Sequence, residues 1–407
     1  MPSRLEKTEL TLGFMPLSDA APLIVARELG FFQRHGLKVQ LSRETSWANI
    51  RDKVALGLLD GAQMLAPMTL ASRIGVDPLS KPLVTALSLD LNGKAITISE
   101  ALYRRLRSYT TSGLDDALTA AHALRRLIDA ERDRPPLTFA VVYPFSMHNY
   151  ILRYWLAAGG IDPDKDVRII VIPPPQMVSQ LRRGAVDGYC VGEPWNSAAV
   201  NEGLGRVLVT DHAIWNNGPE KVLGVTEEWA ERNPQTHDAL ICALLEAVHW
   251  LDQPQHRNEV SELIAGSRFV DIAVDVVRMS MLGTFQFART EFPRSQPDFH
   301  VFHRYAANFP WRSHALWMAT QMQRWHQLPI GVDLVALTAA TYRTDIYRAA
   351  ATRMGLSAPT DDCKSEGLHV RAWKNEQQLK LGPDQFLDRS VFDPQQVMAN
   401  RAGKVAS

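Results

Sequence analysis

A short unit with the pattern G-x-x-D-G occurs twice in the chain and constrains the fold more than any other feature. The copies are residues 57–61 and 184–188. Each follows a stretch with helical apolar periodicity and precedes a β-like run, residues 62–65 and 189–191. Because glycine ends helices and Asp-Gly favours turns, each copy predicts a helix that returns into a buried strand. Two copies predict two similar lobes with a ligand between them, and chance recurrence of a common turn is the alternative.

Strand-like and helix-like segments alternate through the first 90 residues and again from residue 137. Such alternation predicts parallel-type sheets covered by helices. A polar stretch from residue 92 to 134 is predicted to be helical, as is most of the chain after residue 233, up to a polar tail of about 50 residues over the surface. The predicted strands are residues 10–14, 37–41, 61–65, 82–89, 137–143, 167–172, 189–191 and 206–210, and the main predicted helices are residues 21–32, 47–59, 147–158, 173–183, 236–251, 259–266, 271–281, 314–327 and 332–354.

This pattern predicts an α/β chain of two lobes with a helical C-terminal extension. The ligand site of an open α/β sheet lies beyond the carboxyl ends of its strands, so the cleft between the lobes is the expected site. The predicted parts are residues 1–95, the first part of lobe 1; residues 96–212, an inserted lobe 2; residues 213–310, the return to lobe 1 with a helical region; and residues 311–407, the helical extension and C-terminal tail.

Composition excludes several classes of protein. Basic and acidic residues number 44 each, which argues against a chain that binds nucleic acid or a membrane surface by itself. The three cysteines are too sparse for a disulfide framework or a zinc site and fit a reduced compartment. No apolar run approaches the length of about 18 residues that a membrane helix needs. Residues 1–9 carry no export signal, so we expect a cytoplasmic protein; a chain whose leader had been removed would look the same.

Motifs of common enzymes are missing from the sequence, among them G-x-S-x-G, the P-loop, H-E-x-x-H and C-x-x-C. We therefore predict no enzymatic activity, no cofactor and no metal site. Cys190 and His148 could form a nucleophile and base, but Cys190 falls in an apolar strand, which favours a buried, inert thiol. His300 and His303 lack a third ligand at metal spacing and are interpreted as surface residues.

Five residues at predicted junctions and crossovers are candidates for contact with a small ligand. For each, a structural role is the alternative: a core anchor for the indole, and a solvated surface position for the imidazole or an ammonium group. Together they offer an indole N–H, an imidazole, two ammonium groups and a glycine that lets the backbone approach a ligand, with no clustered carboxylates. This set fits a small oxyanion. The candidates are Trp47, Lys94, His148, Gly192 and Lys221.

The sequence resembles one known family, the nitrate- and bicarbonate-binding proteins of bacterial ABC transporters, of the NrtA and CmpA type. The similarity extends from about residue 10 through the helical region to residue 394. The matching segments are residues 12–14, 19–24, 55–57, 60–62, 153–160, 174–178, 190–195, 219–221 and 392–394.

The resemblance implies a type II periplasmic-binding-protein-like fold with an anion between two lobes. It implies that Trp47, His148, Gly192 and Lys221 contact nitrate. A lysine at 221 is similar to the nitrate binders, since bicarbonate binders are expected to carry an acidic residue and a metal there. The transporter proteins have glutamine at the position of Lys94. Lys94 therefore either pairs with a carboxylate or broadens the site toward nitrite or another anion.

Without an export signal, the chain resembles the cytoplasmic, NasS-like nitrate sensors within this group. The resemblance implies that the sensor without nitrate sequesters an ANTAR-type, NasT-like RNA-binding antiterminator. Nitrate, and with it nitrite, is then expected to release this partner to act on leader RNA of nitrate-assimilation genes. The alternatives are the substrate-binding component of a nitrate ABC transporter and, less favoured, a small-molecule enzyme on the same fold.

Overall fold

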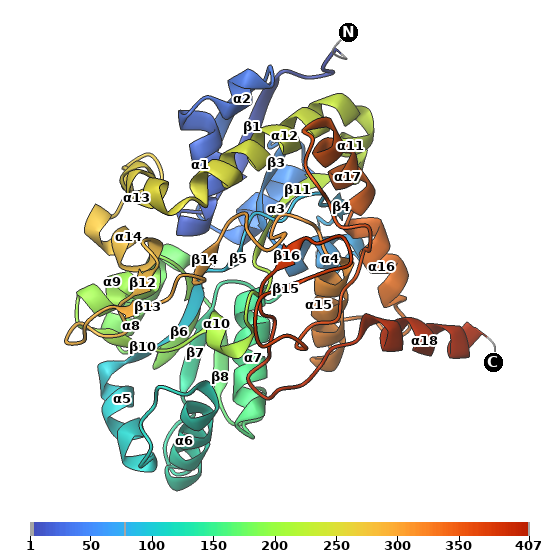
Figure 1. The fold of residues 1–407 in the computed structure, drawn as a ribbon. Coiled ribbons are helices and arrows are strands. Elements are labelled where there is room, and N and C mark those ends of the chain that lie inside the picture. Colours follow the sequence, from blue (N-terminus) through green and yellow to red (C-terminus); the bar gives the residue numbers. More distant parts are fainter. Residues whose placement is uncertain (1–3, 77–78, 406–407) are drawn as a thin grey trace.

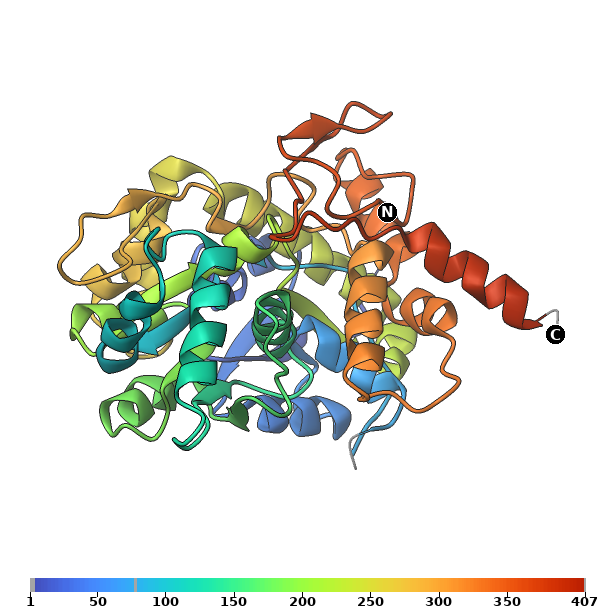
Figure 2. The ribbon, with the colours of Figure 1, turned by 90° about the horizontal axis from the view of Figure 1, so that it is seen from below.

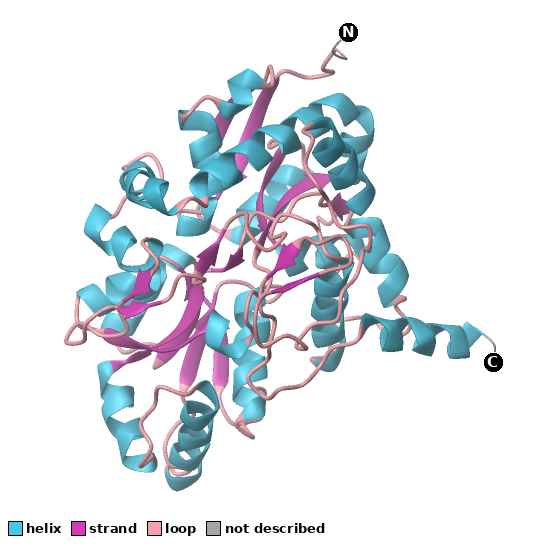
Figure 3. Ribbon diagram, in the orientation of Figure 1, coloured by secondary structure: helices cyan, strands magenta, loops and turns pink. Residues whose placement is uncertain are grey.

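The computed structural model describes residues 4–76 and 79–405, with side chains described up to residue 399. Two five-stranded sheets form two lobes, one above the other in Figures 1 and 3. The strands of the first sheet are β1 (Glu9–Phe14), β2 (Lys38–Arg43), β3 (Gly61–Leu65), β4 (Leu83–Val84) and β11 (Lys221–Thr226). Those of the second sheet are β6 (Lys94–Ser99), β7 (Thr138–Val141), β8 (Arg168–Val171), β9 (Gly188–Gly192) and β10 (Gly205–Thr210).

Both sheets mix parallel and antiparallel pairs. The strand order is β2-β1-β3-β11-β4 in the first sheet, and β11 runs antiparallel to β3 and β4. The order is β10-β6-β9-β7-β8 in the second sheet, and β6 runs antiparallel to β9 and β10. The predicted parallel pairing holds for β1 with β2 and β3, and for β7 with β8 and β9. It fails at β6 and β11, the first strands after each crossover between lobes.

Helices cover the faces of both sheets. In lobe 1 these are α1 (Ala21–Glu28), α2 (Phe31–Arg34), α3 (Trp47–Ala55), α4 (Ala66–Arg73), α11 (Glu227–Arg232) and α12 (Pro234–Leu251). In lobe 2 they are α5 (Glu100–Leu106), α6 (Ala117–Ala130), α7 (Met147–Ala158), α8 (Met177–Arg182), α9 (Trp195–Asn201) and α10 (Asp211–Ile214). Four short 3-10 helices are Ser18–Ala20, Arg107–Tyr109, Pro174–Gln176 and Pro254–His256.

The C-terminal part adds helices and three small two-stranded sheets. The helices are α13 (Arg257–Ala265), α14 (Val274–Met281), α15 (Arg312–Arg324), α16 (Leu334–Thr341), α17 (Thr344–Arg353) and α18 (Pro394–Val405). The small sheets pair β5 (Leu91–Asn92) with β14 (His300–Val301), β12 (Thr284–Phe285) with β13 (Arg294–Ser295), and β15 (Trp373–Lys374) with β16 (Lys380–Leu381). The strands β15 and β16 lie over the body, as predicted for the tail, whereas α18 projects away from it (Figure 2).

The repeated G-x-x-D-G unit has the same geometry in both lobes. Asp60 accepts a hydrogen bond from the backbone N–H of Thr11 at 2.9 Å, and Asp187 accepts one from Thr138 at 2.8 Å. In each case the backbone N–H of the aspartate donates back to the same residue, at 2.9 Å and 2.8 Å. The leading glycines have left-handed φ values, 73° at residue 57 and 69° at residue 184, which favour glycine. The predicted structural repeat is confirmed.

Several predicted elements differ from the structure. The predicted helix 92–134 contains β6, whose alternating Ile96 and Ile98 are buried, as in a strand. The predicted helix 21–32 breaks at Gly30, where φ is 76°. Of the predicted strand 82–89 only β4 forms, and β11 was not predicted at all. The second sheet comes from one continuous stretch of chain, while the exact limits of the four predicted parts stay a prediction.

No helix among residues 4–76 and 79–405 is long and apolar enough to cross a bilayer.

Candidate functional site

Four of the five candidate residues converge where the lobes meet. Serine N-caps start α3 and α7: Ser46 and Ser146 accept the backbone N–H groups of Asn49 and Asn149 at 3.2 and 3.1 Å. These caps place Trp47 and His148 in the first turns of the two helices. The remaining candidates, Gly192 and Lys221, end β9 and begin β11.

Direct distances connect the four residues. The Lys221 Nζ lies 5.5 Å from the centroid of the Trp47 ring. A Cβ atom placed on Gly192 would lie 3.7 Å from His148 Nε2, so the glycine leaves the imidazole uncovered. The side chains of Trp47, His148 and Lys221 are all at most 1% exposed. The three polar groups therefore come from different elements into one buried position.

Two donor groups of this site make no hydrogen bond among the described residues, although His148 Nε2 lies 3.3 Å from Glu220 Oε1. These are the indole N–H of Trp47 and the imidazole of His148. Burial lowers the pKa of His148 to about 3, so the ring is neutral at physiological pH and one of its nitrogens carries a proton to donate. Since an unpaired buried donor costs free energy, these groups point to an acceptor supplied by a ligand.

Carboxylates cluster around Lys221, which corrects the prediction that the site has none. Lys221 Nζ donates to Asp19 Oδ2 at 2.8 Å and also to Glu220 Oε1. The Lys221 backbone N–H donates to Asp90 Oδ1 at 2.9 Å. Asp19 is held in place by Gln63 of β3, whose side-chain amide donates to its Oδ1. The sequence carries no signal for this cluster, because its acidic residues lie far apart in the chain.

Lys94 is buried beside the site and is paired with carboxylates on two sides. Its Nζ lies 2.7 Å from Asp211 Oδ2 and 2.7 Å from Glu220 Oε2. On the sheet, Lys94 of β6 lies directly opposite Gly192 of β9. Of the two roles open for Lys94, pairing with a carboxylate is the one that the structure shows.

The charges of the cluster shift the pKa values of its members. Burial raises the pKa of Asp19, and it raises that of Asp90 well above the ordinary value, with the charge of Asp19 adding to the effect. Burial raises the pKa of Asp211 to about 6, against the influence of Lys94. Burial also opposes ionisation of Glu220, but the ammonium groups of Lys221 and Lys94 more than offset it, so its pKa is lowered. Glu220 is therefore the carboxylate that is most firmly ionised.

The two lobes contact each other directly at this position. The backbone N–H of Ser18 donates to the Glu193 carbonyl at 2.7 Å, and the indole N–H of Trp195 donates to the Pro16 carbonyl at 3.1 Å. These bonds join the segment after β1 in lobe 1 to the segment after β9 in lobe 2. The segments that follow β1 and β9 thus join the two lobes.

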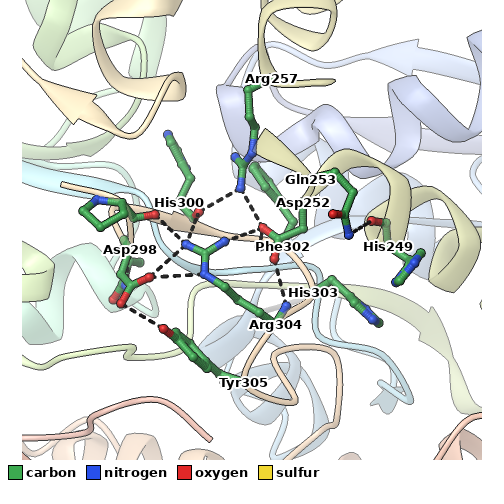
Figure 4. Close-up of polar contacts among 12 residues, drawn as sticks. His249, Asp252, Gln253, Arg257, Asp298, His300, Phe302, His303, Arg304 and Tyr305 are labelled. Carbon is green, nitrogen blue, oxygen red and sulfur yellow. Dashed lines mark hydrogen bonds and ion pairs between the residues drawn. The ribbon is translucent and has the colours of Figure 1, made fainter. Parts of the chain in front are cut away.

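His300 is not a surface residue, and this prediction was wrong. It belongs to β14, is 3% exposed and lies against Gly93 of the first crossover, where an added Cβ would come within 2.7 Å of its Nδ1. Asp252 anchors the segment that follows β14 (Figure 4). Its carboxylate accepts from Arg257 at 2.6 Å and from Arg304 at 2.7 Å. The neighbouring His303 is partly buried and lies 2.9 Å from Asn308 Oδ1.

Cys190 lies in the middle of β9, fully buried, and burial raises the pKa of its thiol well above the ordinary value. A buried thiol of raised pKa is a poor nucleophile. Among the described residues no group of three or more histidine, cysteine, aspartate and glutamate side chains is arranged to hold a metal ion. The chemistry of the site is that of hydrogen-bond donors and fixed charges.

The profile of the NMT1-like family matches residues 3–265, more than half of the chain. The chain belongs to the NMT1-like family. A solved relative is the periplasmic nitrate-binding protein NrtA from Synechocystis PCC 6803, with a TM-score of 0.85 and 29% identity over 98% of both chains. The fold is thus the α/β periplasmic-binding-protein fold.

Two curated relatives are longer than this chain. The nitrate import ATP-binding protein NrtC of Synechocystis sp. is 42% identical over 355 residues, 86% of this chain and 51% of that protein. The bicarbonate transport ATP-binding protein CmpC of the same organism is 43% identical over 354 residues, 86% of this chain and 51% of that protein. The chain therefore spans about half the length of these relatives, whose names divide between two anions.

Proposed function

We propose that the chain binds nitrate, and nitrite as a second ligand, at the buried position between Trp47, His148, Gly192 and Lys221. The observation that carries the proposal is the pair of buried donors without a partner, the Trp47 indole N–H and the His148 imidazole, beside the Lys221 ammonium group. A planar oxyanion with several acceptor oxygens can accept from all three donors at once. Gly192 leaves room for it next to His148.

Lys221 favours nitrate over bicarbonate. A cation at this position complements a weakly basic monoanion directly, whereas a carboxylate in its place would need a metal ion to bring in bicarbonate. The ion pairs of Lys221 with Asp19 and Glu220 partly neutralise its positive charge. The donors of Trp47 and His148 therefore supply a large share of the recognition of nitrate.

Calorimetric titration with nitrate, nitrite, bicarbonate and sulfate tests this assignment. We expect nitrate and nitrite to bind, and we expect Lys221→Glu to abolish binding of both because it reverses the charge that faces the anion. The matched control is Lys38→Glu on β2, whose exposed ammonium group contacts the exposed Glu9 and no residue of the site. Binding of bicarbonate without nitrate would show that the ligand is wrong.

We propose further that the chain acts in the cytoplasm as a NasS-like nitrate sensor that sequesters an ANTAR-type, NasT-like antiterminator when it holds no nitrate. Two facts support a role through a protein partner. The chain is 42% identical to about half of a nitrate import ATP-binding protein, and 29% identical to the free-standing NrtA. In addition, the lobes meet at the anion position through the Ser18–Glu193 bond, so the anion and the relative position of the lobes are coupled.

Size-exclusion chromatography with the purified antiterminator tests the sensor role. We expect a complex without nitrate and its dissociation when nitrate is added, because nitrate must bind the partner-free form more tightly in order to release the partner. Lys221→Glu is expected to keep the complex in the presence of nitrate. The alternative is the substrate-binding component of a nitrate ABC transporter, which the likeness to periplasmic NrtA favours. An anion-binding chain that forms no complex with the antiterminator would support that alternative.

A further inference from the structure

Glu220 is the central acid of the buried cluster because its two oxygens face different cations. Oε1 contacts the Lys221 ammonium group and lies 3.3 Å from His148 Nε2. Oε2 lies 2.7 Å from Lys94 Nζ. The Glu220, Lys221 and Lys94 side chains are all at most 1% exposed. No other described carboxylate contacts both of these lysines.

The Oε1 side of Glu220 contacts two of the donors that the proposed function assigns to nitrate. A carboxylate resembles nitrate in the properties that these donors detect: it is planar, carries one negative charge and presents oxygen acceptors. Lys221 and His148 can give only a limited number of hydrogen bonds in this dry position. An entering anion and Oε1 of Glu220 therefore compete for the same donors.

Lys94 is placed to keep Glu220 paired with a cation when an anion binds. It contacts the opposite oxygen of Glu220 and is itself fixed by Asp211 at 2.7 Å, on the side away from His148 and Lys221. When an anion takes the donors of Lys221 and His148, Glu220 must keep a cation, because an unpaired buried carboxylate is strongly destabilising. Lys94 is the remaining cation within contact distance of Glu220.

We propose that Glu220 is an internal competitor of the anion and that Lys94 is a positioning residue that holds Glu220 aside when the anion binds. The inference rests on the proposed function, since it assigns the same donors to nitrate. It gives Lys94 a role without direct contact between its ammonium group and the anion.

The test is a double-mutant cycle on nitrate affinity, measured by calorimetry on the full chain. Glu220→Gln removes the competing charge, and we expect nitrate to bind at least threefold more tightly. Lys94→Gln leaves Glu220 with Lys221 as its only ammonium partner, and we expect binding at least tenfold weaker. In the double variant the competitor is absent, so nitrate is expected to bind at least as tightly as in the wild type.

Matched variants separate this role from a loss of stability. Lys364 is a largely buried lysine between Glu366 and Asp384, far from the site in sequence and in a different cluster. Lys364→Gln is expected to lower the melting temperature without changing nitrate affinity. If Lys94→Gln does not fold alone, the variant Lys94→Gln/Asp211→Asn removes two opposite charges together, and the same weakening is expected.

Opposite outcomes separate the inference from the proposed function. Weaker nitrate binding by Glu220→Gln would overturn the inference while leaving nitrate binding in place. The same holds if the loss of nitrate affinity in Lys94→Gln is equally large in the double variant Lys94→Gln/Glu220→Gln. A failure of both the wild type and Glu220→Gln to bind any of the four anions would overturn the proposed function instead.

Discussion

The two G-x-x-D-G units share their backbone chemistry and differ in the residues that follow. In both lobes an aspartate ties the end of a helix to the first residues of a neighbouring strand. Counted from the last glycine of each unit, Leu65 of lobe 1 corresponds to Gly192 of lobe 2. Leu65 is a core residue, whereas Gly192 lies beside Asp19 and His148. The turn is therefore repeated in both lobes, whereas the strand that follows it ends in a leucine in lobe 1 and in a glycine in lobe 2.

The helix starts differ in the same way. Both α3 and α7 begin at a serine cap, and both place a polar side chain in the first turn that faces the site. In lobe 1 that side chain is the indole of Trp47, which does not titrate. In lobe 2 it is the imidazole of His148, which does. Of these two side chains, only that of His148 is therefore sensitive to pH.

The largest effect, on nitrate affinity, is expected at Gly192, which corresponds to Leu65 in the other lobe. Gly192→Val places side-chain atoms near Asp19 Oδ2, 3.2 Å from the position of an added Cβ, and near His148. We expect nitrate affinity to fall at least 100-fold, about 2.7 kcal/mol, in calorimetric titration. The control is Leu65→Val in lobe 1, which is expected to cost about 1 kcal/mol of stability and no affinity. Normal binding by Gly192→Val would contradict the placement of the anion.

The aspartates that the two units share, Asp60 and Asp187, are expected to affect stability when they are replaced. Asp60→Ala and Asp187→Ala each remove the acceptor of a backbone N–H, and urea unfolding followed by circular dichroism should show losses of about 1–3 kcal/mol. The loss should be larger for Asp60, because it also accepts from the Trp229 indole at 3.0 Å. Both variants should keep the nitrate affinity of the wild type. A selective loss of affinity at Asp187 would show that the repeat is more than architectural.

A smaller effect, on stability at acidic pH, is expected from His148, the residue of the Trp47 and His148 pair that titrates. His148 has a pKa of about 3 in the folded protein, below its ordinary value of 6.5. A depressed pKa gives stability that is present above pH 6.5 and is lost as the pH falls, by about 1 kcal/mol between pH 6.5 and 5.5. Thermal unfolding at the two pH values should show this loss, reduced in His148→Gln. His237, also buried and neutral with a pKa of about 4, is expected to add an acid-sensitive contribution from lobe 1 that the variant keeps.

The smallest effect is expected at the second position after the unit, where Gln63 in lobe 1 corresponds to Cys190 in lobe 2. Cys190→Ala leaves all contacts of the site in place, so we expect about 1 kcal/mol of destabilisation and unchanged nitrate affinity. Chemical denaturation and calorimetry on the same sample would measure both. A large loss of affinity in Cys190→Ala would reopen a direct role for the thiol.

The sequence was sufficient for the repeat, the first residues of α3 and α7 and the burial of Cys190, because these depend on patterns within a few residues. The proposed ligand roles of Trp47, His148, Gly192 and Lys221 rest on their positions at predicted junctions and on the family resemblance. The acidic half of the site was missed: Asp19, Asp90 and Asp211 each look like ordinary solvated carboxylates. Only tertiary packing brings them together: Asp211 follows β10 and Lys94 begins β6, its antiparallel neighbour in the second sheet, while Asp19 and Asp90 come from lobe 1.

The strands β6 and β11 were missed for a related reason. Each is six residues long, begins with a lysine and follows a crossover, so its short apolar stretch is difficult to separate from the polar residues around it. The burial of His300 was missed because β14 pairs with β5 across a long separation in sequence. In each case the deciding interaction is tertiary and leaves no local pattern.

The central place of β11 in the first sheet bears on the order in which the chain can fold. This strand lies between β3 and β4, although more than 130 residues separate it from them in the sequence. Every strand of the second sheet comes from the intervening stretch, so a ribosome completes lobe 2 before it delivers the strand that lobe 1 requires. During synthesis we therefore expect lobe 2 to fold first and lobe 1 to wait, with β3 unpaired on one side, for its partner from the far end of the insertion.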